Sequence, residues 1–250
     1  MNPLILKSGL WGLFAGSSLL IGALVGYYSS IGKKVISSIM GFGAGVLISA
    51  LSFDLMDEAY QSGGFLATSI GFISGALIYS VANYFLSVNG AKHRKRSGNQ
   101  LKNEAKSNNG TALAVGALLD GIPESIAIGI SMIHGGAVSI ATIIAIFISN
   151  VPEGLSSSAG MKNAGKSKLF IFGMWTVIAL ISGLSSVVGY TVFSNLPNEI
   201  VSGTTAVAAG AILCMLSDTM IPEAFESDHH WIGLITVSGF LCAFILEKIA

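Results

Sequence analysis

Long stretches without a charged residue alternate with short polar connections along this chain. The uncharged gaps run over residues 8–32, 35–53, 59–91, 169–198, 200–217 and 229–246. Most are long enough to cross a bilayer, because a transmembrane helix needs roughly 20 apolar residues. Two further stretches contain acids but are otherwise apolar. Together they predict eight transmembrane helices, over approximately 8–31, 35–59, 64–87, 111–134, 137–160, 169–192, 200–224 and 230–247.

The composition supports a membrane protein. Of the 250 residues, 52% are hydrophobic and 10% are charged, whereas about 25% are charged in an average soluble domain. The first uncharged stretch, residues 8–32, is longer than the roughly 7 to 15 residues of a signal-peptide core, so we expect it to be retained. The expected fold class is an all-α integral membrane protein, with a single transmembrane transporter domain over residues 1–250.

Basic residues gather in the connections that would share one side of an eight-span protein. Eleven of the thirteen lie there: Lys33, Lys34, Lys92, Arg94, Lys95, Arg96, Lys102, Lys106, Lys162, Lys166 and Lys168. Only Lys7 and Lys248 lie on the other side. Because basic loops stay in the cytoplasm, both termini are predicted to be extracellular. Residues 88–110 are predicted to form a cytoplasmic basic loop between the third and fourth spans, and no nucleic-acid partner is expected.

Two segments resemble each other at an offset of 165 residues. They read "GFGAGVLISALSFDLMDEA" from Gly41 and "AVAAGAILCMLSDTMIPEA" from Ala206. The first lies in the second predicted span and the second in the seventh, and these spans cross the membrane in opposite directions. Inverted repeats of this kind are typical of secondary transporters. They predict a 3+2+3 arrangement, in which two inverted halves flank the fourth and fifth spans.

The two central spans carry matching polar motifs, "LDGIPESIAIGISM" and "ISNVPEGLSSSAGM". In the fourth span Asp120 and Glu124 share a helix face, because residues four apart are neighbours. In the fifth span Ser149 and Glu153 share a face in the same way, and Asn150 lies beside them. Five oxygen-bearing side chains are therefore predicted to converge near the middle of the membrane.

Three acids at this depth require compensation. An ionised Asp at the centre of a spanning helix costs about 2.5–3.5 kcal/mol on insertion scales, and the middles of these two spans contain no Lys, Arg or His. Protonation, a water-filled cavity and a bound metal ion each offer compensation. A divalent cation would account for all three acids together.

Further acids lie toward the ends of the spans. Asp54, Asp57 and Glu58 fall at the outer end of the second span, and Asp218 and Glu223 toward the inner end of the seventh. A negative mouth concentrates cations, so the first group is a possible metal entrance and the second a possible exit. The alternative is that these helix-end acids are simply solvated.

The motifs "DGIPES", "SNVPEG" and "SDTMIPEA" resemble those of the ZIP family of divalent metal transporters, and the resemblance covers the whole chain. It implies eight helices, extracellular termini and movement of zinc, iron or manganese toward the cytoplasm. It also implies a transport site lined by Asp120, Glu124, Ser149, Asn150 and Glu153. The metal would be cargo, so no prosthetic group and no enzymatic activity are expected.

The chain departs from the usual family pattern, which places His where Asp120 and often Ser149 stand. The site therefore offers only side-chain oxygen, which suits manganese, iron(II), magnesium or calcium, whereas zinc favours Cys and His but accepts carboxylates. A membrane metal sensor and an intramembrane metal-dependent hydrolase remain alternatives, although the protease motif H-E-x-x-H is absent. The expected partners are divalent metal ions and the lipid bilayer, with a homodimer left open. Short loops favour a multi-pass protein of a bacterial plasma membrane.

Overall fold

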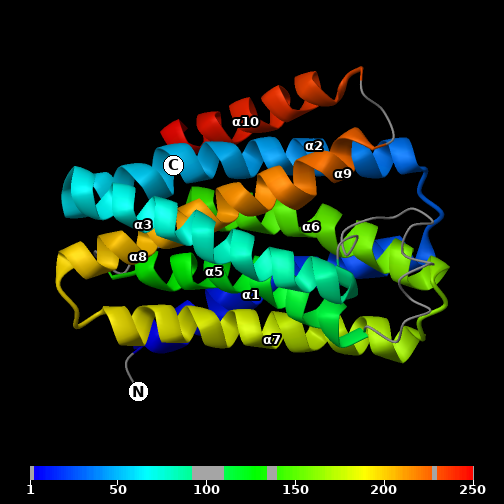
Figure 1. Ribbon diagram of the computed structural model, residues 1–250, viewed down its shortest axis with the longest axis horizontal. Helices are drawn as coiled ribbons and strands as arrows, with labels where there is room; N and C mark the ends of the chain where they lie inside the picture. The colour runs from blue at the N-terminus through cyan, green and yellow to red at the C-terminus, as the bar shows by residue number, and fades with distance from the viewer. Residues whose placement is uncertain (1–2, 92–109, 134–139, 227–229, 250) are drawn as a thin grey trace.

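The computed structural model describes residues 3–91, 110–133, 140–226 and 230–249, which form a bundle of helices (Figure 1). In chain order these are α1 (Pro3–Tyr28), α2 (Lys33–Ala50), the π-helix η1 (Leu51–Leu55), α3 (Met56–Leu86), the π-helix η2 (Ser87–Ala91), α5 (Gly110–Ser131), α6 (Ile140–Asn163), α7 (Lys168–Phe193), α8 (Asn198–Met215), the π-helix η3 (Leu216–Met220), α9 (Ile221–Phe225) and α10 (Ile232–Ile249). The all-helical prediction is confirmed for this part of the chain.

Six helical stretches among the described residues are long and apolar enough to cross a membrane. They are Pro3–Tyr28, Lys33–Asn89, Ala114–Ser131, Lys168–Phe193, Asn198–Phe225 and Ile232–Ile249. The 57-residue stretch would be about 85 Å long as one straight helix, far beyond a bilayer. It is broken at Gly64, whose φ of 70° is readily adopted only by glycine, and Figure 1 shows the chain turning back between α2 and the later part of α3.

Helix α6 corresponds to the fifth predicted span but is not among these six stretches. It has 24 residues, which is long enough to cross, but the sequence "SNVPEGLSSS" makes it polar. Instead of facing lipid with this polar segment, α6 packs mainly against α1 and α2, while α5 packs mainly against α7 and α8. The two central helices are therefore enclosed by the rest of the bundle.

The two segments that repeat in the sequence also have matching secondary structure. Helices α2 and α8 both have 18 residues, and each continues into a five-residue π-helix, η1 or η3. All of these boundaries differ by the same offset of 165 residues. A Cβ atom on Gly45 would meet the backbone of α10, and one on the equivalent Gly210 would meet the backbone of α3. The shared glycine thus permits a close helix contact in both segments.

Both chain ends lie at the same end of the bundle in Figure 1. The first turns of α2 and α7 lie at the opposite end. These helices begin at Lys33 and Lys168. Within the basic loop predicted over residues 88–110, η2 continues the helix to Ala91. Residues 92–109 of that predicted loop lie outside the described residues.

Candidate functional site

The three central acids are buried within the protein. Asp120 and Glu124 on α5 are each 2% exposed, and Glu153 on α6 is 5% exposed. Each helix runs on through its proline, Pro123 or Pro152, although a proline cannot donate to the carbonyl four residues earlier. Carboxylates and weakened backbone pairing therefore coincide at the middle of both helices. Burying a charge is costly unless it is paired or binds a metal, so this region requires polar partners.

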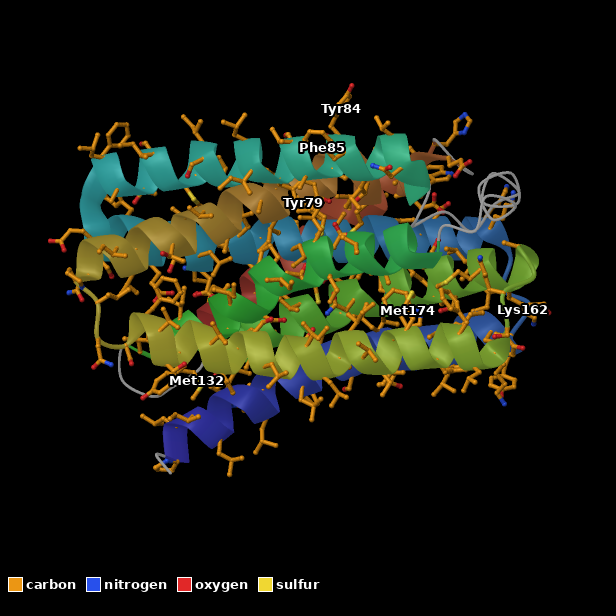
Figure 2. The ribbon with its side chains drawn as sticks, turned by 60° about the horizontal axis from the view of Figure 1, so that its bottom comes forward. Tyr79, Tyr84, Phe85, Met132, Lys162 and Met174 are labelled. Atoms are coloured by element: carbon orange, nitrogen blue, oxygen red, sulfur yellow. The ribbon has the colours of Figure 1, made fainter. Side chains whose placement is uncertain are left out.

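Tyr79 on α3 supplies one such partner. Its hydroxyl donates a hydrogen bond of 2.5 Å to Oδ1 of Asp120, and its side chain is 1% exposed. Figure 2 shows Tyr79 at mid-length in the bundle, between Met132 and Lys162 along its long axis. Asp120 is thus held from a helix that is distant in sequence.

The predicted neutral ligands Ser149 and Asn150 are also buried. The Ser149 hydroxyl donates to the carbonyl oxygen of Ile146 at 2.9 Å, and the Asn150 amide donates to that of Ala15 at 3.4 Å. Both side chains use a hydrogen in these bonds. Their oxygen atoms keep lone pairs that can accept a hydrogen bond or bind a cation.

The carboxylates of the site do not form one compact cluster. Within the part of the chain that the structure describes, no three His, Cys, Asp or Glu side chains gather closely enough to hold a metal ion. A cation bound at this depth would therefore need neutral oxygen ligands in addition to carboxylates. Asp120 and Glu124 lie on α5, whereas Ser149, Asn150 and Glu153 lie on α6.

The two predicted exit acids contact different helices. Glu223 on α9 is buried and accepts a hydrogen bond of 3.1 Å from Ser156, one turn beyond Glu153 on α6. Asp218 in η3 is exposed and accepts a 3.2 Å hydrogen bond from Asn83 on α3. The structure therefore connects Glu223, but not Asp218, to the helix that carries part of the candidate site.

The predicted entrance acids lie at the junction of η1 and α3. Asp54 and Glu58 are half-buried, and Asp57 is exposed. Glu58 precedes Glu223 by 165 residues, the same offset that separates the two repeated segments. The entrance and exit groups thus each contain one acid at an equivalent position.

Sequence reasoning missed Tyr79 and Ser156. A tyrosine in the middle of an apolar span is a usable signal, because a buried phenol normally finds a hydrogen-bond partner. Ser156 gives a weaker sequence signal, because it stands in a run of three serines that are all buried. Only the fold shows which of the three contacts a carboxylate.

No family model matches the chain. Two curated proteins are similar to it. The zinc transporter ZupT of Clostridium perfringens (strain 13 / Type A) is 27% identical over 283 aligned positions, which cover 98% of this chain and 95% of the relative. The zinc transporter ZTP29 of Arabidopsis thaliana is 27% identical over 230 positions, which cover 86% of this chain and 83% of the relative.

Both relatives are named transporters, which supports the expectation that this chain is not an enzyme. Their similarity extends over most of the chain and is not limited to the central motifs. The resemblance to the ZIP family of metal transporters, first indicated by the Pro-Glu motifs, is thereby confirmed.

Proposed function

We propose that this chain is a multi-pass membrane transporter that moves divalent metal ions toward the cytoplasm. The observation that carries the proposal is the burial of Asp120, Glu124 and Glu153 at the proline-containing middles of α5 and α6. Carboxylates so placed need a cation or protons, and intramembrane acids typically mark an ion pathway. Two relatives named zinc transporters make zinc the first cargo to test, with iron(II) and manganese next.

The proposed transport site consists of Asp120, Glu124, Ser149, Asn150 and Glu153. All five side chains are buried, and all bind through oxygen. Zinc accepts carboxylate ligands, whereas manganese and iron(II) tolerate an all-oxygen environment more readily. The donor set therefore suits several divalent metals, and the similarity to zinc transporters favours zinc among them.

The proposed pathway starts at Asp54, Asp57 and Glu58 and leads through the site to Glu223. Asp218 lies on the side of η3 that faces α3. We therefore place it only at the cytoplasmic opening of the exit, where it would attract the departing metal. We propose that this pathway crosses a bacterial plasma membrane through eight spans. The spans form a 3+2+3 inverted repeat, and both termini are extracellular. The equal offset of α2 with η1 and α8 with η3 supports this arrangement, because inverted halves commonly rock about a central site.

Purified protein in liposomes tests the proposal. Uptake of zinc, manganese, iron(II) and cadmium is measured for the wild type and for the double variant Glu124→Ala, Glu153→Ala. A second double variant, Glu199→Ala, Glu247→Ala, serves as the control because it removes two acids outside the site. We expect saturable uptake that only the first variant loses. A folded wild type that carries none of these metals would contradict the proposal, and binding without flux would favour a sensor.

A further inference from the structure

Three lysines at the junction of α6 and α7 are held against aromatic rings, and we call them the lysine patch. Each ammonium nitrogen lies within the roughly 6 Å of a cation–π contact. The pairs are Lys162 over Tyr27 at 5.1 Å from the ring centre, Lys166 over Phe170 at 5.7 Å and Lys168 over Tyr28 at 5.1 Å. Lys162 also donates a hydrogen bond of 2.5 Å to the backbone carbonyl of Tyr27. These contacts restrict side chains that are otherwise long and flexible.

The positive charge of the lysine patch has no acidic counterpart on the helices that carry it. Helices α1 and α7 contain no Asp or Glu, and α6 contains none after Glu153. Among the described residues, the partners of the three ammonium groups are neutral, namely aromatic side chains and one backbone carbonyl. Because an ammonium group has three hydrogens to donate, each lysine of the patch can still bind an anion.

A polar cavity adjoins the lysine patch at Lys162. It has a volume of about 260 Å³ and lies between α1, α2 and α6. Lys162 and Asn163 of α6 contribute polar side chains to its wall, as do Ser29 and Ser30 just after α1. These four residues are exposed, so the cavity is accessible from outside the bundle. One water needs only about 10–15 Å³, so there is room for a phosphate group.

The place of the lysine patch in the bundle indicates which anion it meets. Tyr28 is the last residue of α1, and Lys168 is the first residue of α7. The patch therefore lies where apolar helices leave the membrane. Leu169, next to Lys168, is 84% exposed, as expected for a side chain that faces lipid. Phospholipid phosphates lie at this level, and basic pockets between membrane helices on the cytoplasmic side bind anionic headgroups.

We propose that the lysine patch and the adjoining cavity bind the phosphate of an anionic phospholipid, such as phosphatidylglycerol, in the cytoplasmic leaflet. The choice of leaflet rests on the orientation given in the proposed function, whereas the binding itself does not depend on metal transport. The bound headgroup joins the ends of α1, α6 and α7. Because α6 also carries Glu153, the lipid stabilises a helix of the candidate transport site.

The test uses purified protein in mixed micelles of neutral detergent and phosphatidylcholine, without added metal. The melting temperature is measured as the mole fraction of phosphatidylglycerol rises, and mass spectrometry of the intact protein counts the lipids that stay bound. The wild type is compared with Lys162→Gln and with the triple variant Lys162→Gln, Lys166→Gln, Lys168→Gln. Lys248→Gln is the matched control, because Lys248 also lies over aromatic rings but in the last turn of α10.

We expect phosphatidylglycerol to raise the melting temperature of the wild type and of Lys248→Gln, and to stay bound to both. Lys162→Gln should need about fivefold more phosphatidylglycerol for half of the effect, since a lysine near an anionic lipid surface contributes about that factor in affinity. The triple variant should lose the effect.

A triple variant that responds like the wild type would overturn the proposal, as would a wild type that gains as much from additional phosphatidylcholine. Inorganic phosphate is added in a separate arm, and an equal rise in melting temperature there would identify a site for a free anion and overturn the lipid assignment. None of these measurements involves metal or flux. Failure of metal uptake in liposomes would therefore leave the lipid site standing, and failure of lipid binding would leave the transport function standing.

Discussion

The hydroxyl of Ser156 on α6 donates a hydrogen bond to the buried carboxylate of Glu223 on α9. Ser156 follows Glu153 by three residues on the same helix, so this bond ties the end of the candidate site to the segment where we place the exit. Breaking the bond should therefore affect both stability and transport.

Replacing Ser156 with Ala should lower the free energy of unfolding by about 1–2 kcal/mol, because a buried carboxylate loses a donor. Thermal or chemical unfolding in detergent measures the change. Ser238→Ala on α10 is the control, since that serine is exposed and its hydroxyl donates to the carbonyl of Leu234 in its own helix. Equal stability of the two variants would show that the bond to Glu223 contributes nothing.

The opposite face of α6 depends on a glycine. A Cβ atom on Gly154 would overlap the backbone of Leu19 in α1, and neither backbone can move without shifting a whole helix. Gly154→Ala should therefore cost about 1–3 kcal/mol of stability, as overpacking typically does. Gly173→Ala on α7, where a Cβ meets nothing within 4 Å, should be tolerated. Monodispersity and melting temperature in detergent distinguish the two, and a Gly154→Ala protein as stable as Gly173→Ala would refute the close contact.

Much of the helical layout could be predicted from where charges are missing. The sixth predicted span, 169–192, agrees closely with α7 (Lys168–Phe193), because polar connections bound it on both sides. The first helix starts at Pro3 and not at residue 8, because Lys7 does not end it; a lysine near a helix end can extend its amine toward water.

The details of the site were less predictable. Spacing along one helix places Asp120 and Glu124 on a shared face, but it cannot identify a partner on another helix. The bond from Tyr79 to Asp120 depends on how α3 packs beside α5, and the bond from Ser156 to Glu223 depends on α9. The π-helices also escaped prediction, since apolar periodicity does not register one additional residue in a turn.

The proposed orientation can be tested with single cysteines, in a protein from which Cys214 and Cys242 have been removed. Asn195 follows α7 and Ser30 follows α1, and both are exposed. With extracellular termini, Asn195→Cys should react with a membrane-impermeant thiol reagent in intact cells, whereas Ser30→Cys should react only after the cells are opened. The reverse pattern would invert the topology and, with it, the proposed entrance and exit.

Protons should compete with metal at the central carboxylates, because a carboxylate must lose its proton before it can bind a cation. The apparent KM for zinc should therefore rise as the pH falls from neutral to acidic. Glu153→Gln, which keeps the shape of the side chain but cannot ionise, should raise KM by at least about tenfold and weaken this pH dependence, since one proton fewer competes. Uptake by liposomes at matched internal and external pH measures both effects.

The exposed Glu226 provides the control variant Glu226→Gln, for which we expect the wild-type pH profile. A wild-type KM that does not change with pH would mean that metal does not displace protons from these acids, and ligands other than Asp120, Glu124 and Glu153 would then have to be sought.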